Sequence, residues 1–366
     1  MKIGCVKEIK KLESRLGLTP SSVKEYVNHG HELFIEKGAG VNSGFSDAVY
    51  EEAGAKILKT AKEVWDHVDM IVKVKEPLES EYQYFRPGLI IYTYLHLAAD
   101  EKLTKAMLDS NVLGVAYETI VTDDGTLPCL KPMSEVAGRL SVIEGAKYLE
   151  KPFGGSGVLI SGVTGVERAN VTIVGAGVVG ENALKMAVGL GANVTILDID
   201  MKKLTYIDDL YGNRVTTLYS NNHNIQEACE RADLVISGVL LPGAKAPKLI
   251  KRTFYEKMRE GSVIVDVAID QGGSTEVSKA TYHDEPTFDV DGIVHYCVAN
   301  MPGAVPRTST IALNNSTLKY GMMIANYGLE EAIKISEPLR HGVNTYHGYC
   351  TCPGVAEAFD IECKTL

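Results

Sequence analysis

Four charged or titratable side chains occupy positions from which they could act together on a small organic acid. Arg15, Lys75 and His96 each follow or end a short β-branched run in the first third of the chain, and Asp270 ends a similar run later. In open α/β sheets the carboxyl ends of parallel strands face the ligand crevice, so this shared position favours a common site. Each residue alone could equally be a packing or surface residue.

The four residue types suit recognition of a carboxylate and proton transfer beside it. The guanidinium of Arg15 can bind a carboxylate through two parallel hydrogen bonds, and Lys75 offers a point charge to a carbonyl oxygen. His96 can donate or accept a proton near neutral pH. Asp270 can orient or deprotonate a water or an amine, and the Gly272-Gly273 pair after it leaves that loop room to adjust.

A Gly-x-Gly-x-x-Gly loop, placed between a β-branched run and a helix, predicts a dinucleotide site. Gly175 would permit a tight turn, Gly177 would let the backbone approach a pyrophosphate, and Gly180 would allow close packing of helix on strand. The helix N-terminus then offers N–H groups to the phosphates. Asp198 ends the next predicted strand, 18 residues after Gly180, which is close to the spacing expected of a ribose ligand. A glycine-rich turn without a ligand is the alternative.

The acid at position 198 favours NAD over NADP. Its carboxylate can accept hydrogen bonds from ribose hydroxyls, whereas a 2′-phosphate would meet a like charge. That repulsion is about 4 kcal/mol per charge pair at roughly 4 Å and an effective dielectric near 20. Lys202 and Lys203 are close in sequence and would partly offset it, although they are equally well explained as solvated lysines of a first helical turn.

Short β-branched runs alternate with amphipathic stretches, which predicts an α/β fold with two Rossmann-like domains, parallel sheets and flanking helices. Strands are predicted near 2–6, 32–35, 69–75, 89–95 and 112–116, then near 170–175, 193–198, 215–219, 233–237, 262–268 and 293–299. Helices are predicted from Ser21 with Thr19 as cap and Pro20 in the first turn, at 47–53, 99–109 and 134–149, and after the first four strands of the second series. Beyond residue 308 the pattern predicts helix, a short strand near 346 and a last helix near 355–360.

Composition limits the class of protein. A chain of 366 residues is long enough for about two domains. The net charge of −10 gives no support to nucleic acid or an anionic membrane as partner. Seven scattered cysteines argue against a disulfide framework, and the N-terminus lacks a signal-peptide core. We therefore expect a cytoplasmic enzyme without a metal site, because His347, Cys350 and Cys352 match metal-ligand spacing only loosely.

Several longer motifs resemble the alanine dehydrogenase family, which is related to the NAD domain of proton-translocating transhydrogenases. The resemblance covers nearly the whole chain. Its motifs are Lys7-Glu-Ile-Lys10, Leu18-Thr-Pro20, Val74-Lys-Glu-Pro77, Tyr94-Leu-His96, the glycine loop 175–180, Leu197-Asp-Ile199, Gly243-Ala-Lys-Ala-Pro247, 263–273 and 295–310. The last two blocks are the most specific, and their combination is not expected by chance.

The resemblance implies reversible, NAD-dependent oxidation of L-alanine to pyruvate and ammonium. It makes His96 and Asp270 catalytic, and it assigns substrate binding to Arg15 and Lys75. The positions it implies for NAD are Ser134, Gly175, Gly177, Val178, Val179, Gly180, Asp198, Lys203, Ser220, Val239, Leu240, Val267, Ala268, Ile269, Asp270, Lys279, Val298, Ala299, Asn300 and Met301. Lys279 stands where the family has an arginine.

The resemblance also implies how the domains are built. Residues 1–130 and 306–366 would form a discontinuous substrate domain, and residues 131–305 would form the NAD-binding domain. A cleft between the domains would hold the reaction, and the chain would assemble as a homohexamer.

Three other functions remain open. A transhydrogenase-type NAD-binding subunit would share these motifs, and the lack of a membrane segment counts against it. A saccharopine-type dehydrogenase would take a larger substrate, so the volume of the pocket would distinguish it. A catalytically silent NAD-binding protein is disfavoured because Arg15, Lys75 and His96 are all present, together with Asp270.

Overall fold

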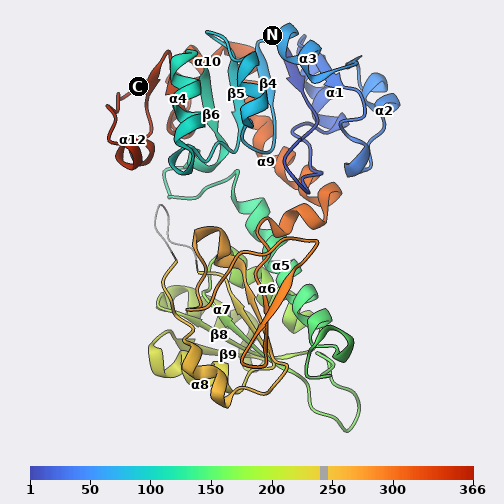
Figure 1. The fold of residues 1–366 in the computed structure, drawn as a ribbon, viewed down its shortest axis with the longest axis vertical. Coiled ribbons are helices and arrows are strands. Elements are labelled where there is room, and N and C mark those ends of the chain that lie inside the picture. The colour runs from blue at the N-terminus through green and yellow to red at the C-terminus, as the bar shows by residue number, and fades with distance from the viewer. Residues whose placement is uncertain (240–245) are drawn as a thin grey trace. The chain divides into compact units, whose positions relative to one another are not determined.

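The computed structural model describes residues 1–239 and 246–366, and the chain divides into two compact α/β units (Figure 1). Unit 1 contains Met1–Met133 and Val305–Leu366, and unit 2 contains Ser134–Ala304. The α/β fold class is therefore confirmed. The predicted domain breaks lie close to these bounds, while the assignment of substrate to one unit and NAD to the other stays a prediction, as does the cleft.

The sheet of unit 1 has the strand order β15-β14-β6-β5-β4-β1-β2-β3. Its strands are β1 (Lys2–Cys5), β2 (Glu32–Glu36), β3 (Lys56–Leu58), β4 (Met70–Val72), β5 (Ile90–Thr93), β6 (Leu113–Ala116), β14 (Val343–Tyr346) and β15 (Tyr349–Cys350). β1 to β6 are parallel, but β14 is antiparallel to β6 and β15 to β14, so this edge is mixed. Because β4 pairs with β1, the winding reverses there, and ligands bind above the carboxyl ends of strands at such a switch point.

The helices of unit 1 flank this sheet (Figure 1). They are α1 (Pro20–Asn28), α2 (Asp47–Glu52), α3 (Ala61–His67), α4 (Glu101–Asp109), α9 (Pro306–Tyr327), α10 (Leu329–Ile335), α11 (Glu337–Gly342) and α12 (Pro353–Phe359). α1 begins as predicted: the Thr19 hydroxyl accepts a hydrogen bond from the backbone N–H of Ser22 (3.2 Å), and Pro20 occupies the first turn. The sequence pattern does not predict β3 or α3, because such short elements show little periodicity.

Helix α9 fixes the loop that follows β1. Thr310 Oγ1 accepts a hydrogen bond from the backbone N–H of Leu16 (3.0 Å), and Asn314 Oδ1 accepts one from that of Thr19 (2.8 Å). Ser43 Oγ donates to the backbone oxygen of Ser14 (2.6 Å). These contacts hold the backbone on both sides of residue 15, so the C-terminal segment of unit 1 helps to position a predicted substrate ligand.

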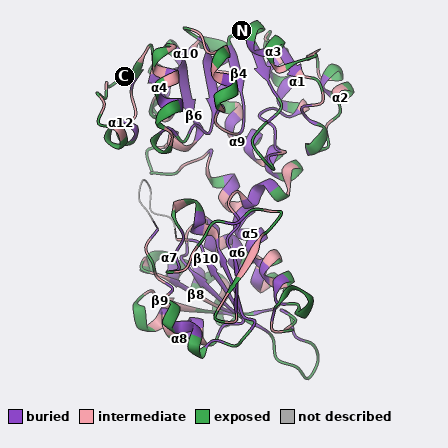
Figure 2. Cartoon of the chain, viewed as in Figure 1, coloured by how far each residue is buried: buried purple, intermediate pink, exposed green. Residues whose placement is uncertain are grey.

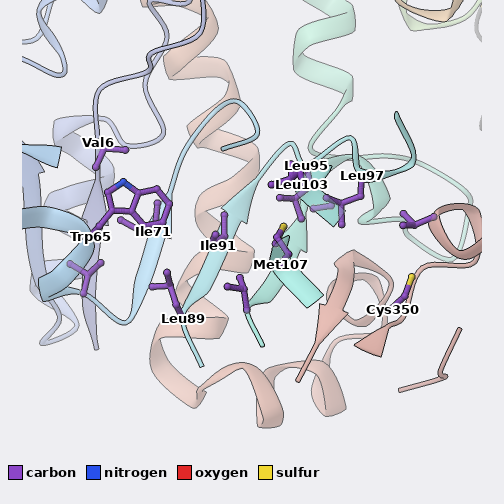
Figure 3. Packing of buried hydrophobic residues seen from close by; sticks show 14 of the residues in the cluster. Val6, Trp65, Ile71, Leu89, Ile91, Leu95, Leu97, Leu103, Met107 and Cys350 are labelled. Atoms are coloured by element: carbon purple, nitrogen blue, oxygen red, sulfur yellow. The ribbon is translucent and has the colours of Figure 1, made fainter. Parts of the chain in front are cut away.

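One buried hydrophobic cluster underlies the loops of unit 1 (Figure 3). Trp65 lies in it, fully buried and stacked on Tyr84 at 5.8 Å between ring centroids. Leu95 and Leu97 belong to the same cluster, together with Met107 of α4. The chain is therefore anchored in the core on both sides of residue 96.

The sheet of unit 2 has the order β12-β13-β11-β10-β7-β8-β9. Its strands are β7 (Asn170–Val174), β8 (Asn193–Asp198), β9 (Val215–Tyr219), β10 (Leu234–Ser237), β11 (Val263–Asp266), β12 (Thr287–Val290) and β13 (Ile293–Tyr296). The switch point lies between β7 and β10. The antiparallel edge strand β12 was not predicted, although the Asp291-Gly292 turn that joins it to β13 has φ of +55° and +78°, the signature of a hairpin turn.

The helices of unit 2 cover the buried strands, and the helix faces that point away from the sheet are exposed (Figure 2). They are α5 (Lys131–Tyr148), α6 (Val178–Gly189), α7 (Met201–Tyr211) and α8 (Asn222–Glu230). A helix predicted after the fourth strand of this series is wrong: the described residues that follow β10 contain only a short 3-10 helix at Arg252–Lys257 before β11. No helix in the described ranges is both long and apolar enough to cross a membrane.

A buried histidine in unit 2 predicts how stability depends on pH. His295 on β13 is fully buried, packs between Tyr255 and Phe288, and has no hydrogen-bond partner on either ring nitrogen among the described residues. Burial lowers its pKa to about 4. The unfolded chain, with a reference pKa of about 6.5, therefore binds a proton that the folded chain does not, so stability falls by up to about 3 kcal/mol as pH drops from roughly 6.5 to 4.

We expect His295→Phe to reduce this loss of stability in acid. Urea midpoints of the wild-type protein and the variant, measured between pH 7 and about pH 4.5, should converge or cross as pH falls. The exposed His223→Ala is the matched control and should behave like the wild type. An identical pH dependence in all three proteins would show that His295 does not supply the titrating group.

Candidate active site

The loops at the switch point of unit 1 carry the predicted substrate ligands. Arg15 follows β1, Lys75 follows β4, and His96 follows the neighbouring strand β5. The strands before Lys75 and His96 end earlier than predicted, at Val72 and Thr93. All three residues nevertheless come after the carboxyl ends of adjacent parallel strands, where ligand sites of this fold class lie.

Arg15 is buried and already engaged by a carboxylate. Its Nε and Nη2 donate to Glu13 Oε1 (2.8 Å) and Oε2 (2.6 Å), and Nη1 donates to the sulfur of Met133 (3.1 Å). Both side chains of the pair are almost fully buried. Burial alone would lower the pKa of Arg15, but the hydrogen bonds and charge of Glu13 raise it overall. The guanidinium is therefore held in one orientation and stays charged.

Lys75 differs because its charge is not compensated. Its amine makes no hydrogen bond or ion pair among the described residues, and burial together with the nearby Arg15 guanidinium lowers its pKa. Its backbone is fixed, since Thr93 Oγ1 donates to its oxygen (3.0 Å). Glu8 Oε1 accepts hydrogen bonds from the N–H groups of Val74 (2.6 Å) and Lys75 (3.3 Å). A half-buried cation of this kind attracts an anionic ligand.

A buried ion-pair cluster fixes the loop that contains Lys75. Lys73 Nζ lies 3.2 Å from Glu8 Oε2 and 3.1 Å from Glu81 Oε1, and all three side chains are buried. Burial alone would lower the pKa of Lys73, but the two carboxylates raise it overall. The cluster fixes Glu8, and Glu8 in turn fixes the backbone at Lys75.

His96 is half exposed, with a side chain 45% accessible, and stacks on the buried ring of Tyr94 at 5.9 Å and 12°. The Tyr94 hydroxyl donates to the backbone oxygen of Cys129 (2.6 Å). The backbone N–H of His96 donates to Glu118 Oε1 (2.6 Å). The imidazole therefore lies at the surface of unit 1 on a rigid platform, available for proton transfer.

In unit 2 the glycine loop between β7 and α6 has the geometry of a dinucleotide-binding loop. Gly175 has φ of +99°, and a Cβ on Gly180 would lie 1.8 Å from the oxygen of Gly175. A Cβ on Gly177 would meet nothing within 4 Å, so the backbone is open to a ligand at the N-terminus of α6. Val178 and Val179 form the first turn of that helix, whose N–H groups suit phosphate.

Asp198 ends β8 as predicted and contacts the glycine loop. Its Oδ2 accepts a hydrogen bond from the backbone N–H of Ala176 (2.6 Å), and its Oδ1 accepts one from that of Asp200 (2.8 Å). A carboxylate can accept about four hydrogen bonds, so lone pairs remain for ribose hydroxyls. The residues present therefore fit a dinucleotide: open backbone, a helix N-terminus and an acid lie at one switch point.

Asp270 does not end a strand, which corrects the sequence prediction. β11 ends at Asp266, and Val267–Gln271 forms a 3-10 helix. Asp266 causes the turn because its buried carboxylate accepts hydrogen bonds from the backbone N–H of Ser274 (2.7 Å) and from the hydroxyls of Ser274 and Ser278 (3.1 and 2.5 Å). Asp270 is exposed on this turn and makes no hydrogen bond or ion pair with described residues.

The loop after Asp270 is held by its glycine conformations and by a lysine, and the prediction that it has room to adjust stays a prediction. Gly272 and Gly273 have φ of +90° and +77°, a conformation that favours glycine. A Cβ on Gly273 would lie 2.7 Å from Asp266 Oδ2. Lys248 Nζ donates to the backbone oxygens of both glycines (2.6 and 2.8 Å). The glycine pair thus sets the backbone geometry next to Asp270.

The remaining positions implied for NAD lie in unit 2, mostly after the carboxyl ends of its parallel strands. Ser220 follows β9, Val239 follows β10, Val267, Ala268 and Ile269 follow β11, Val298, Ala299, Asn300 and Met301 follow β13, Lys203 is exposed on α7, and Ser134 lies in α5. Lys279 lies instead over the ring of Phe288 at 5.3 Å. Leu240 is outside the described residues, as are Gly243 to Lys245.

Sequence reasoning missed the acids that position the predicted residues. Glu13 holds Arg15, Glu8 holds the Lys75 backbone, Glu118 holds the His96 backbone, and Asp266 turns the chain before Asp270. Only the Glu13–Arg15 pair is near enough in sequence to suggest itself. Among the described residues, no three His, Cys, Asp or Glu side chains are arranged to hold a metal ion, and all seven cysteines are unpaired.

Comparison with known proteins covers nearly the whole chain. The family profile "Alanine dehydrogenase/PNT, N-terminal domain" matches residues 4–137, and "Alanine dehydrogenase/PNT, C-terminal domain" matches residues 141–353. Alanine dehydrogenase 2 of Staphylococcus aureus (strain USA300) is 55% identical over 367 aligned residues, which cover 100% of this chain and 98% of that protein.

Solved structures show the same relation. An L-alanine dehydrogenase structure superposes with a TM-score of 0.96 at 49% identity, covering 98% of this chain and 99% of the other. A transhydrogenase from Sinorhizobium meliloti has a TM-score of 0.82 at 24% identity, covering 96% and 99%. The latter likeness shows a shared fold alone.

Proposed function

This chain belongs to the alanine dehydrogenase/PNT family, and on that premise we propose that it catalyses the reversible, NAD-dependent oxidative deamination of L-alanine to pyruvate and ammonium. The observation that carries the proposal within the chain is the set of groups at the switch point of unit 1. There an oriented guanidinium (Arg15), an uncompensated cation (Lys75) and an accessible imidazole (His96) follow adjacent strands. This set suits a small carboxylate with a reacting centre beside it.

We assign the residues of unit 1 to substrate binding and proton transfer. Arg15 and Lys75 bind the carboxylate of alanine or pyruvate and the oxygen on the reacting carbon. NAD, held by the glycine loop, would supply the acceptor for the hydride on the α-carbon of alanine, and loss of that hydride would convert the substrate amine to an iminium. His96 then moves the proton at the substrate oxygen as water adds and the carbinolamine collapses to pyruvate and ammonia.

We assign Asp270 to positioning the water that attacks the iminium or, in the reverse direction, the ammonia. Its carboxylate is exposed and has no partner among the described residues, so it can orient water or, in reverse, ammonia and can stabilise nearby positive charge. The cofactor is held by Gly175, Gly177 and the N-terminus of α6, with Asp198 toward the ribose. We infer NAD rather than NADP, since this acid would repel a 2′-phosphate.

The activity test is direct. Purified protein with L-alanine and NAD should generate NADH, and with pyruvate, ammonium and NADH should consume it. D-alanine and L-glutamate serve as controls for handedness and substrate size. No NADH from L-alanine, under conditions where the protein binds NADH, would contradict the proposal.

Cofactor choice gives a second prediction. Asp198→Ala should weaken NAD binding about tenfold or more and narrow the preference for NAD over NADP, because the ribose loses a charge-assisted hydrogen bond and the like charge is removed. Asp200→Ala is the matched control, since Asp200 caps the next helix through the N–H of Lys202 (2.9 Å). Titration of both variants with NADH and NADPH measures the effect; an unchanged preference in Asp198→Ala would mean that another residue selects the ribose.

Assembly and location complete the proposal. We infer a homohexamer from the family resemblance, and a cytoplasmic location from the scattered cysteines and the N-terminal sequence. A solution mass near six times the 39.7 kDa of one chain supports this assembly, and the mass of a single chain would contradict it.

A further inference from the structure

Glu118 makes an unusual set of contacts at the residue assigned to proton transfer. It lies in a 3-10 helix, Tyr117–Thr119, that directly follows β6, the strand next to β5. Its Oε1 accepts hydrogen bonds from the backbone N–H groups of Leu95 (3.1 Å) and His96 (2.6 Å), and its Oε2 also lies within hydrogen-bond distance of the Leu95 N–H (3.3 Å). One carboxylate thus accepts hydrogen bonds from two successive backbone N–H groups, at the point where the chain leaves strand β5.

His96 has a backbone conformation that needs such support. Its φ of +49° and ψ of +34° lie in the left-handed region, which non-glycine residues adopt rarely and mostly where the surroundings impose it. Its two chain neighbours, Leu95 and Leu97, are both packed in the core of unit 1 and are labelled in Figure 3. The buried leucines fix the chain before and after residue 96, and Glu118 fixes the peptide N–H groups between them.

The same carboxylate also sets the charge around the imidazole. Glu118 Oε1 lies 3.9 Å from His96 Nδ1, too far for a hydrogen bond but close enough for an ion pair when the ring is protonated. The other groups near the ring are Tyr94, which stacks on it, and Glu76. Burial alone would raise the pKa of Glu76, but its hydrogen bond with Lys10 and the nearby His96 lower it. Neither ring nitrogen of His96 makes a hydrogen bond among the described residues, which leaves Nε2 for the substrate.

We propose that Glu118 is the positioning residue of His96: it holds the backbone in the left-handed conformation that presents the imidazole, and it places a carboxylate 3.9 Å from the ring. The inference rests on the proposed function for its catalytic consequence, because it assigns His96 the proton transfer. It adds a residue that touches neither substrate nor cofactor in this account. Glu118 acts through His96, so its removal should matter only while that imidazole is present.

Two substitutions separate the two effects of Glu118. Glu118→Gln keeps one oxygen that can accept the backbone N–H groups but loses the charge, and Glu118→Ala loses both. We expect kcat to fall about tenfold in Glu118→Gln and further in Glu118→Ala, with NADH affinity unchanged in both. Glu63→Gln is the control: Glu63 also accepts a backbone N–H, that of Lys59 (2.8 Å), but outside the site.

The decisive comparison uses the His96→Ala background. There, Glu118→Gln should cost less than about twofold more activity, since residues that act as one unit are strongly non-additive. A full additional loss in that background, or a Glu118→Gln enzyme with wild-type kcat, would overturn the inference.

A readout that needs no turnover separates this inference from the proposed function. Backbone NMR spectra should show the N–H signals of Leu95 and His96 shifted in Glu118→Ala, which removes their acceptor, and nearer to the wild-type positions in Glu118→Gln. That shift without any alanine oxidation would retain the positioning role and reject the proposed reaction. Unshifted N–H signals of Leu95 and His96 in an active Glu118→Ala enzyme would reject the positioning role and retain the reaction.

Discussion

Replacing His96 with alanine or Asp270 with asparagine is expected to lower kcat at least about 100-fold in both reaction directions. His96 carries the proton at the substrate oxygen, and its accessible ring on the Tyr94 platform has no competing hydrogen bond among the described residues. Asp270 positions water or ammonia, and asparagine keeps its size while removing its charge. Steady-state kinetics with alanine plus NAD, and with pyruvate plus ammonium plus NADH, measure both directions.

The two variants should fold normally and still bind NADH. Their side chains are exposed or half exposed, so neither change empties the core. Because both residues act on one intermediate, the double variant should be far less than multiplicatively worse. A variant that keeps more than about a tenth of wild-type kcat in both directions would remove its residue from the catalytic pair.

Removing the predicted anion-binding residues should have the second-largest effect. Arg15→Ala and Lys75→Ala should each lower kcat/KM about 10- to 100-fold or more, because the substrate carboxylate loses a charge-assisted hydrogen bond. NADH binding should stay nearly unchanged, since both residues lie in unit 1 and outside the glycine loop. Equal losses of NADH affinity in both variants would mean that the substrate assignment is wrong.

The Glu13–Arg15 pair gives this prediction an internal control. In Arg15→Ala the buried Glu13 carboxylate loses its bidentate partner and becomes a negative charge beside the anion site. Breaking a buried pair from one side typically costs about 3–5 kcal/mol of stability. Adding Glu13→Gln to Arg15→Ala should therefore restore part of the stability and part of the pyruvate affinity. If the double variant is no better than Arg15→Ala in either measurement, Glu13 is not the source of the extra cost.

Much of the fold follows from local sequence pattern. The predicted strands of both series are present, although several end earlier than predicted, and the Thr19–Pro20 start of α1 and the glycine loop before α6 lie where predicted. The corrected elements depend on other interactions: β11 ends early because Asp266 bonds to Ser274 and Ser278 beyond the strand. The Asp291-Gly292 pair is a sequence signal for the hairpin turn that joins β12 to β13. Predicting strands from β-branched runs alone does not take such turn residues into account.

The sequence predicts which residues form the candidate site, but it does not predict the acidic residues that hold them in place. Strand ends at a switch point identify Arg15, Lys75 and His96, because sheet topology brings those ends together. The acids that hold them come from other loops: Glu8 bonds to Val74 across 66 positions of sequence. Hydrogen bonds between residues so far apart in sequence produce no periodic pattern. The geometry of each loop is therefore visible only in the three-dimensional structure.

The most direct test of the proposed reaction follows the hydrogen on the α-carbon of alanine. L-Alanine carrying deuterium at that carbon, incubated with the protein and NAD, should give NADH with one deuterium on the nicotinamide ring and an equal amount of pyruvate and ammonium. D-Alanine labelled in the same way should give neither product. Pyruvate formed without deuterium in NADH, or no transfer from labelled L-alanine by protein that binds NADH, would contradict the account.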